Sequence, residues 1–480
     1  MPSCKRGKNI KVLRNSARWD ALENASLGCP NLWNKLTPRP SPFVTHNNFG
    51  GGFVSEKDQV ALSSMRYGAP DSAGAVTRQA RDGKPTQYLE ASMSQEDALP
   101  PWAVRAGARK TIYHDPAQVT AAIVTCGGLC PGLNDVVQGL VNKLSDYGVP
   151  EGNIMGIKYG FRNHHAVQPI FHRPPPSKSG MAFGWDPEAA SHCTLTQRSE
   201  TVDTDWEIVK RIDMWGIDML FVVGGNGGNA GANAINEMCQ QHEVNCCVVG
   251  VPKSIDNDIL LIDKCFGFDT AVEESQRALL AAKVEASSAR RGIGLVKLMG
   301  RQSGFIAVQA SMASGVVDAC LIPEVPFKLH GPNGLLAYLE YVIKCKGHAV
   351  LCVAEGAGQD LLDGTAGADA SGNPILQDIG TFLKSEMKSY YKDADIKYID
   401  PTYMIRAIPT TSNDRIYCKV LAHNAVHAAF GGFTGLTVGL VNTHYVLLPI
   451  PVVISAPRTV DPRGKMWNRL RTSIGQPNFV

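Results

Sequence analysis

From about residue 111 onward, short apolar runs alternate with glycine-containing turns and with segments whose apolar residues recur at helical spacing. The first unit shows the pattern clearly. Residues 121–126 predict a strand, residues 127–134 predict a turn, and the apolar residues between Val136 and Leu144 predict a helix. Alternating strands and helices are typical of α/β domains with mainly parallel sheets, in which ligand-binding groups gather at the carboxyl ends of the strands.

The same order of strand, turn and helix recurs along the chain. Further strands are predicted to begin near Met219, Val248, Leu295, Cys320 and Val350. The second of these units carries a glycine-rich turn at residues 224–228. Because a chain of 480 residues exceeds the usual size of a single hydrophobic core, we expect at least two domains.

The first hundred or so residues lack this alternation. Prolines at 38, 40 and 42, glycines at 50–52 and a polar span at 71–97 predict an extended arm rather than a core, with a neighbouring subunit as a candidate contact. Residues 1–19 are basic, with no acidic residue before Asp20. This bias is typical of organellar transit peptides and equally of a plain basic tail.

Charge and composition exclude two classes of function. The formal net charge is +3, and the chain has neither a Lys/Arg run of the kind that binds nucleic acid nor an apolar stretch long enough to span a bilayer, so we expect a soluble protein. Most of the 13 cysteines lie within apolar runs without paired zinc-ligand spacing, which favours free buried thiols in a reducing compartment. Cys126 and Cys130 flank the first glycine turn, which leaves a redox or metal role open for this pair.

Residues 248–258 carry the strongest indication of chemistry. An apolar strand ends at Pro252, and Ser254, Asp256 and Asp258 then occupy alternate positions of a loop. At the carboxyl end of a strand, one aspartate can take the proton of an attacking hydroxyl while the other orients it or holds Mg²⁺, as phosphoryl transfer requires. A solvated turn is the alternative interpretation, because Asp and Asn are common in turns for local hydrogen-bonding reasons.

Five ordered stretches give the chain a resemblance to a known family. They are residues 126–134 (Cys-Gly-Gly-Leu-Cys-Pro-Gly-Leu-Asn), 252–258 (Pro-Lys-Ser-Ile-Asp-Asn-Asp), 297–301 (Lys-Leu-Met-Gly-Arg), 354–360 (Ala-Glu-Gly-Ala-Gly-Gln-Asp) and 397–406 (Lys-Tyr-Ile-Asp-Pro-Thr-Tyr-Met-Ile-Arg). From about residue 106 to its end the chain resembles the 6-phosphofructokinases, specifically the long plant-type ATP-dependent subgroup.

The resemblance implies a phosphofructokinase-like α/β fold of two three-layer α/β/α domains with mainly parallel sheets. Residues 1–105 would be an N-terminal extension, residues 106–267 with 404–455 a nucleotide-binding domain, and residues 268–403 with 456–480 a sugar-phosphate-binding domain. The resemblance also implies a homo- or hetero-oligomer with phosphofructokinase-like subunits.

The acceptor chemistry follows residue by residue from the resemblance. Asp256 would take the proton from the sugar 1-hydroxyl as it attacks the terminal phosphate, a role usually worth roughly 10²–10⁴-fold in rate. Ser254, Asp258 and Arg301 complete the catalytic set. The residues that match the fructose 6-phosphate pocket are Met299, Gly300, Arg301, Glu324, Lys397, Tyr403 and Arg406, with Lys397 placed to meet the 6-phosphate. Cations suit this dianion, and Glu324 can accept hydrogen bonds from sugar hydroxyls.

The nucleotide half departs from the family pattern. The residues that match it are Gly127, Gly128, Arg162, Gly225, Asn226, Gly227 and Gly228. Asn226 stands where the family carries an aspartate that serves Mg²⁺, so the metal-ligand candidate is a neutral amide whose carbonyl oxygen can still coordinate. Pro187 stands where an arginine normally meets the transferring phosphates, and Arg162 or Lys158 could substitute for it.

Two positions bear on the phosphoryl donor. Pyrophosphate-using relatives typically carry an aspartate where Gly227 stands, which would block the ATP α-phosphate, so Gly227 favours ATP. Lys253 favours pyrophosphate in a simple interpretation, but the plant-type ATP subgroup also has lysine there.

Two functions therefore stay open. The first is an ATP- and Mg²⁺-dependent 6-phosphofructokinase that makes fructose 1,6-bisphosphate in glycolysis. The second is a catalytically impaired regulatory or structural subunit that retains the fructose 6-phosphate site but has lost ligands of Mg-ATP. We expect a cytoplasmic protein, with a plastid or mitochondrion as the alternative, and neither a nucleic-acid partner nor membrane insertion.

Overall fold

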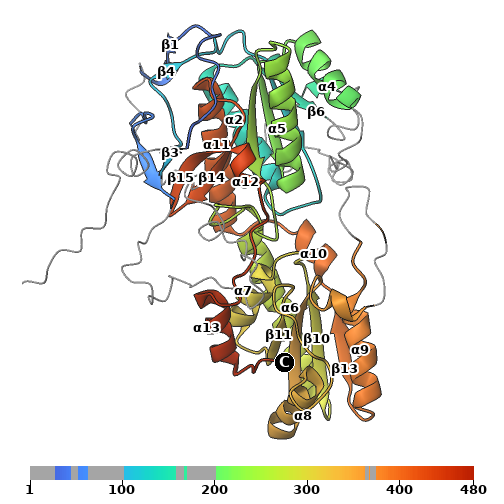
Figure 1. Ribbon diagram of the computed structural model, residues 1–480. Helices are drawn as coiled ribbons and strands as arrows, with labels where there is room; N and C mark the ends of the chain where they lie inside the picture. Colours follow the sequence, from blue (N-terminus) through green and yellow to red (C-terminus); the bar gives the residue numbers. More distant parts are fainter. Residues whose placement is uncertain are drawn as a thin grey trace, which may run out of the picture.

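The computed structural model describes residues 27–44, 52–62, 102–157, 167–169, 202–362, 367 and 375–479. Figure 1 shows two lobes, each built around one β-sheet, with the larger sheet in the upper lobe and the smaller sheet in the lower lobe. Within the described residues, no helix is long and apolar enough to cross a membrane.

The upper lobe contains a nine-stranded sheet. Its strands, in spatial order, are β2 (Gln59–Ala61), β3 (Trp102–Arg105), β15 (His444–Pro449), β14 (Leu436–Val441), β9 (Cys247–Pro252), β8 (Met219–Gly224), β5 (Ala121–Thr125), β6 (Ile154–Ile157) and β7 (Val167–Pro169). The five central strands from β14 to β6 are parallel, and antiparallel strands flank them on both sides. The carboxyl ends of β5, β8 and β9 therefore meet at one edge of the sheet.

Helices cover both faces of this sheet. They are α2 (Leu133–Tyr147) and α11 (Ser412–Phe430) on one face, and α4 (Val202–Met214) and α5 (Asn226–Gln241) on the other. Strand β8 explains the arrangement, because Phe221 packs in the core of α2 and α11 whereas Leu220 and Val222 pack in the core of α4 and α5. A strand buried on both faces is continuously apolar, which is the pattern the sequence shows.

The lower lobe repeats the three-layer arrangement with a parallel four-stranded sheet. Its strands, in spatial order, are β11 (Ala319–Leu321), β12 (His348–Ala354), β10 (Gly292–Leu298) and β13 (Ile396–Ile399). One face is covered by α6 (Phe268–Ser288), α7 (Phe305–Ser314) and α13 (Lys465–Ile474), and the other by α8 (Leu335–Lys346) and α9 (Ile379–Tyr390).

The remaining elements are short. They are β1 (Arg39–Pro40) paired with β4 (Thr111–Ile112), α10 (Thr402–Ala407), α12 (Ile450–Val453), and 3-10 turns at Pro42–Val44, Glu151–Asn153 and Gln359–Leu361. In Figure 1, α10 lies where the two lobes meet.

The structure confirms the predicted fold class. The predicted strand 121–126 is β5, and the strands expected near Met219, Val248, Leu295, Cys320 and Val350 are β8, β9, β10, β11 and β12. Both lobes have three layers with mainly parallel sheets. The residues at which one domain passes into the other stay a prediction.

Part of the predicted N-terminal arm belongs to the core of the first lobe. Leu32 is 5% exposed within the cluster formed by α2 and α11. The Trp33 indole donates to the Gly431 carbonyl at 2.8 Å and stacks on Tyr113 at 5.7 Å. The expectation of an arm outside the core is therefore wrong for residues 27–44, where isolated apolar residues among prolines gave no periodic pattern. Residues 1–26, 45–51 and 63–101 of the predicted arm lie outside the described part of the chain.

The side chains of Cys126 and Cys130 are both buried. The Cys130 thiol donates to the Phe266 carbonyl at 3.3 Å, and burial raises the pKa of Cys130 to about 12. A Cβ at Gly267 would lie 2.4 Å from the Cys130 sulfur, so the thiol packs tightly against the start of α6. This geometry fits a structural role for the thiol, because a reactive cysteine needs a lowered pKa and access to solvent.

Candidate active site

The loop after β9 is fixed by the residue between its two aspartates. Asn257 has φ 58°, in the left-handed region that asparagine tolerates better than most residues. Its side-chain oxygen accepts from the backbone N–H of Cys265 at 2.8 Å, and its side-chain nitrogen donates to the Asp263 carbonyl at 3.3 Å. These bonds hold Asp256 and Asp258 on either side of a rigid turn.

Both carboxylate oxygens of Asp258 accept hydrogen bonds. The Ser254 hydroxyl donates to Oδ1, and the Asn226 Nδ2 donates to Oδ2 at 3.2 Å. Ser254 comes from the same loop, whereas Asn226 is the first residue of α5. Asp258 is therefore held in one orientation by groups from both sides of the site.

Asp256 is in the opposite situation. Its Oδ1 is buried and has no hydrogen-bond partner within the described chain. Burial, followed by repulsion from Asp258 and Glu355, raises the pKa of Asp256 to about 7, against the opposing effect of Arg406 and Arg301. A carboxylate with this pKa can accept a proton near neutral pH, as a general base must.

Two glycine turns face this loop from the larger sheet. The buried ammonium group of Lys253 donates to the Gly128 carbonyl at 2.8 Å, and burial lowers the pKa of this lysine. Gly127 has φ 82°, and a Cβ there would lie 3.4 Å from the Lys253 ammonium nitrogen. Lys253, which precedes Ser254, therefore holds the first glycine turn against the loop after β9.

The second glycine turn is the start of α5. Its N-cap is Gly225, with no side-chain cap and no acidic residue in the first turn, which contains Asn226, Gly227 and Gly228. The first-turn N–H groups of an uncapped helix are an anion-binding site, because they carry a partial positive charge and lack intrahelical partners. This arrangement suits phosphate oxygens.

The turn after β10 is shaped by two glycines. Gly300 has φ 136°, and Gly356 donates its backbone N–H to the Gly300 carbonyl at 3.0 Å. A Cβ at Gly356 would lie 1.9 Å from the Arg301 carbonyl oxygen, so only glycine fits there without moving the turn. Met299 is buried, and the Arg301 guanidinium lies 3.8 Å from the Glu355 carboxylate. The turn thus brings Arg301 and Glu355 to the same end of the sheet.

Glu324 follows β11, and its carboxylate contacts Gly304, the N-cap residue of α7. Its carboxylate accepts from the backbone N–H of Gly304 at 2.9 Å and from that of Val460 at 2.7 Å. Burial raises the pKa of Glu324, and these backbone donors oppose that effect. The side chain is therefore anchored, with acceptor capacity left for a further donor.

Helix α10 brings two of the predicted sugar residues to the junction of the lobes. The Arg406 guanidinium carbon lies 5.9 Å from the centroid of the Tyr403 ring, and Arg406 is near enough to lower the pKa of Asp256. Tyr403 is 81% exposed, so this side of the site is open in a single chain.

Lys397 lies apart from these residues. It is on the edge strand β13 opposite Gly294, and it pairs with Asp395 at 3.2 Å. Strand β10 continues from Gly294 to Leu298, which at about 3.3 Å per residue places Lys397 about 13 Å before the turn that carries Met299, Gly300 and Arg301. Its role toward the 6-phosphate stays a prediction, and Lys158, Arg162 and Pro187 lie outside the described residues.

The structure adds three residues that the sequence did not assign. Asn257 locks the catalytic loop, Glu355 raises the pKa of Asp256, and Lys297 binds the Asp400 carboxylate at 2.9 Å. Asp400 also accepts from the backbone N–H of Thr402 at 3.1 Å, at the start of α10. All of them lie inside the stretches that carry the family resemblance, so their position in these stretches was the feature of the sequence that could have identified them.

The site also offers oxygen atoms that suit a cation. The Asn226 Oδ1 and the Asp256 Oδ1 are both buried and lack hydrogen-bond partners in the part of the chain that is described. Mg²⁺ takes carboxylate and carbonyl oxygens together with water and phosphate oxygens. The donor set therefore fits Mg²⁺ even with an amide at position 226.

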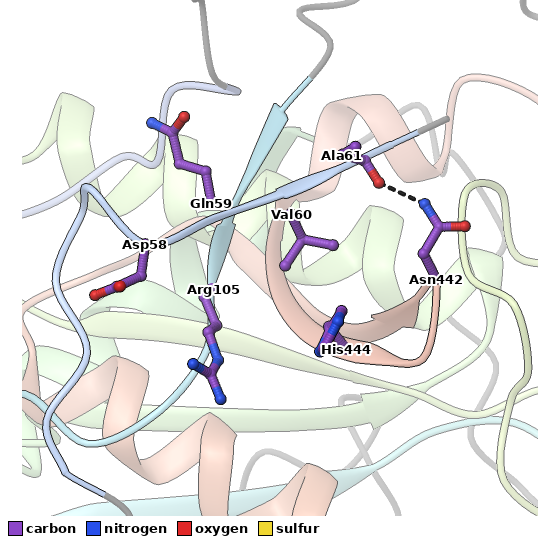
Figure 2. Close-up of a pocket in the computed structure, with 7 residues that line it drawn as sticks. All are labelled: Asp58, Gln59, Val60, Ala61, Arg105, Asn442 and His444. Carbon is purple, nitrogen blue, oxygen red and sulfur yellow. Dashed lines mark hydrogen bonds between the residues drawn. The ribbon is translucent and has the colours of Figure 1, made fainter. Parts of the chain in front are cut away.

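A pocket of about 460 Å³ lies elsewhere on the first lobe (Figure 2). It is lined by Asp58, Gln59, Val60, Ala61, Arg105, Asn442 and His444. The Asn442 side chain donates to the Ala61 carbonyl at 2.5 Å. None of the predicted site residues that the structure describes lines this pocket, which lies at the edge formed by β2, β3 and the turn between β14 and β15.

Comparisons with known proteins identify the family to which the chain is similar. A family model described as Phosphofructokinase matches residues 120–429. The chain is 50% identical over 433 residues to ATP-dependent 6-phosphofructokinase 5, chloroplastic, of Arabidopsis thaliana, covering 89% of this chain and 76% of that protein. It is 40% identical over 442 residues to ATP-dependent 6-phosphofructokinase of Borreliella burgdorferi, covering 88% and 91%. The crystal structure of a pyrophosphate-dependent phosphofructokinase from Marinobacter aquaeolei has a TM-score of 0.59 at 17% identity, covering 74% of this chain and 91% of that one.

Proposed function

This chain belongs to the phosphofructokinase family, and we propose that it is an ATP-dependent 6-phosphofructokinase. The reaction transfers the γ-phosphoryl group of ATP to the 1-hydroxyl of fructose 6-phosphate and gives fructose 1,6-bisphosphate and ADP. The observation that carries the proposal is Asp256, a carboxylate whose pKa is raised to about 7 and whose Oδ1 has no partner among the described residues. It lies beside the anchored Asp258 and the uncapped start of α5.

Asp256 has the role of general base. The 1-hydroxyl donates its proton to the Asp256 carboxylate as the hydroxyl oxygen attacks the γ-phosphorus, and the bond to the ADP oxygen breaks. Asp258 supports this step through its charge, because its repulsion contributes to the raised pKa of Asp256. Ser254 and Asn226 keep Asp258 from rotating away.

The donor phosphates lie at the two glycine turns. The first-turn N–H groups of α5 at Gly227 and Gly228 receive phosphate oxygens, with Gly225 at the N-cap and Gly127 and Gly128 on the facing turn. Mg²⁺ would be held by the Asn226 carbonyl oxygen and the neighbouring carboxylates, where it would neutralise charge on the phosphates. Arg162 stays a candidate for the same phosphates.

The acceptor sugar lies between the turn after β10 and α10. Arg301 and Arg406 supply positive charge, and Glu324 accepts hydrogen bonds from sugar hydroxyls. Met299, Gly300 and Tyr403 shape this side of the pocket, and Lys397 is the candidate for the 6-phosphate.

Two features favour ATP over pyrophosphate as the donor. Gly227 leaves room beside the first turn of α5, where an aspartate would repel the α-phosphate. The relatives at 40–50% identity are named ATP-dependent. The pyrophosphate-dependent neighbour, at 17% identity, bears on the fold alone.

A catalytically impaired regulatory subunit is the second candidate, and among the described residues Asn226 is the departure from the family pattern that favours it. A neutral amide weakens the attraction for Mg²⁺ compared with aspartate. The oxygen of this amide is nevertheless buried without a partner among the described residues, as an amide oxygen available to a cation would be.

We also propose a plastid location, which the name of the Arabidopsis relative supports and imaging of a fluorescent fusion would test.

The test is formation of fructose 1,6-bisphosphate by the purified chain with fructose 6-phosphate and Mg²⁺, supplied with either ATP or pyrophosphate. We expect turnover with ATP and its loss in Asp256→Asn. Asp146→Asn is the matched control, because Asp146 pairs with Lys143 on the exposed face of α2. Fructose 6-phosphate binding without turnover from either donor would instead support the regulatory subunit.

A further inference from the structure

The C-terminal chain crosses the junction between the lobes beside the active site. In Figure 1 it passes from α12 in the upper lobe to α13 in the lower lobe. On this path the backbone N–H of Arg458 donates to the Asp258 carbonyl at 2.8 Å. Two residues later, the backbone N–H of Val460 donates to the Glu324 carboxylate at 2.7 Å. One short segment therefore touches both the catalytic loop and the sugar-site glutamate.

The Arg458 side chain strengthens the first of these links. Its guanidinium donates to the carbonyls of Ile262 and Asp263 at 3.0 and 2.9 Å. The guanidinium carbon lies 4.7 Å from the ring centroid of Phe305, the first residue of α7. The same side chain thus joins the loop that follows Asp258 to a helix of the other lobe.

The use of an arginine here needs an explanation. Burial lowers the pKa of Arg458, and burying a charge opposes folding unless its hydrogen bonds are satisfied. A purely apolar contact with Phe305 could be made by methionine or leucine without that opposition. Methionine could not donate to the two carbonyls, so the loop from residue 259 to 263 would lose both of these hydrogen bonds.

We infer that Arg458 is a positioning residue for the phosphoryl transfer, which holds the loop of residues 254–263 so that Asp256 and Asp258 face the acceptor site on the other lobe. Arg458 itself touches neither substrate nor Asp256 in this account. The inference rests on the proposed function, because it assigns the loop a catalytic task. A displacement of about 1 Å at reacting groups can reduce a rate roughly 100-fold, so the loop need not unfold for the effect to be large.

A second buried arginine provides a matched control. Arg109 lies 5.3 Å from the Phe433 ring centroid and donates to the Arg105 carbonyl at 2.9 Å. Burial lowers its pKa as well, but it lies in the N-terminal part of the first lobe. Arg109→Met therefore removes a buried, ring-stacked guanidinium that has no contact with the catalytic loop.

The experiment compares Arg458→Met, Arg458→Lys and Arg109→Met in the full chain. Melting temperature, kcat, both KM values and amide hydrogen exchange across residues 254–263 are measured for each. We expect Arg458→Met to lower kcat roughly 100-fold and to speed exchange in the loop, and Arg458→Lys to recover part of the loss because it keeps a donor and a charge. Arg109→Met should lower the melting temperature while kcat stays within about twofold of wild type and loop exchange is unchanged.

Two other results overturn the inference. The first is a kcat of Arg458→Met within about twofold of the wild-type kcat. The second is an equal loss of kcat in Arg458→Met and Arg109→Met. Either result would give Arg458 only a general structural role. If Arg458→Met does not fold, the folded Arg458→Lys decides by the same comparison of kcat and loop exchange. Absence of turnover in the wild type would refute the proposed function instead, and loop exchange would then still show whether Arg458 positions the loop.

Discussion

Asn226 and Asp258 are joined across the donor and acceptor halves of the site, with the Asn226 Nδ2 donating to the Asp258 Oδ2 at 3.2 Å. An aspartate at position 226 could not make this bond without carrying a proton. The amide therefore orients the Asp258 carboxylate, and its own oxygen is buried without a partner in the described structure. The amide nitrogen of Asn226 thus binds Asp258, and its oxygen is available to a metal.

Asn226→Asp should make stability depend more strongly on Mg²⁺. Two facing carboxylates about 4 Å apart repel by roughly 1–4 kcal/mol without a cation, so the variant should melt below wild type in EDTA. With Mg²⁺ the melting temperature of the variant should recover, and its kcat should rise above that of wild type, because a carboxylate binds this metal better than an amide. Thermal melting with and without Mg²⁺ measures the first effect, with Asn226→Ala as the control for loss of the hydrogen bond. Equal melting shifts in Asn226→Asp and Asn226→Ala would contradict this prediction.

Asp256→Asn should stabilise the protein at high pH. The folded pKa of Asp256, about 7, lies above the ordinary value of 3.8 for an aspartate, so the folded state binds more protons between these pH values and stability falls as pH rises through them. Removing the ionisable group removes this loss, which is at most about 4 kcal/mol above pH 7 and vanishes near pH 4. Melting temperatures at pH 5 and pH 8 check the prediction, with Asp146→Asn as a surface control. A stability gain independent of pH would show that Asp256 does not titrate in this range.

Gly356→Ala should disturb the sugar pocket. The new methyl group would lie 1.9 Å from the Arg301 carbonyl, so the turn of Gly300 and Arg301 must move, at a cost of about 1–3 kcal/mol in stability. We expect kcat/KM for fructose 6-phosphate to fall at least tenfold, with a smaller change in KM for ATP. The control is Gly152→Ala, because a Cβ at Gly152 meets nothing within 4 Å. Unchanged kinetics in Gly356→Ala would mean that the turn can shift freely.

The sequence predicted the three-layer fold because both faces of each central strand are buried, which makes the strands recognisable as apolar runs. It also placed Asp256 and Asp258 at a strand end. It could not predict that Lys397 lies about 13 Å before the pocket turn, because strand register depends on pairing with β10 across a hundred residues of chain. The contacts of Arg458 and of Trp33 could not be predicted from the sequence either, because each joins segments that are distant along the chain.

Lys297→Met should weaken fructose 6-phosphate binding. Lys297 pairs with Asp400 at 2.9 Å and Asp378 at 3.1 Å, and Asp400 holds the first turn of α10, which carries Tyr403 and Arg406. We expect KM for fructose 6-phosphate to rise roughly tenfold, equivalent to about 1.4 kcal/mol, with KM for ATP unchanged.

The conservative Lys297→Arg should keep most of the affinity for fructose 6-phosphate. Lys346→Met is the matched control, because Lys346 pairs with Asp318 in the same lobe, away from α10. A parallel rise of both KM values in Lys297→Met would indicate a general loss of structure rather than a local loosening of α10.

The most direct test of the account is the pH dependence of kcat/KM for fructose 6-phosphate with saturating Mg-ATP. If Asp256 is the general base, kcat/KM should rise with pH through an apparent pKa of about 7, because the carboxylate must be ionised to accept the proton. The residual activity of Asp256→Asn should lack this acidic limb. A profile that is flat between pH 5 and 9, or an acidic limb that persists in Asp256→Asn, would contradict the assignment of Asp256 as the base of the transfer.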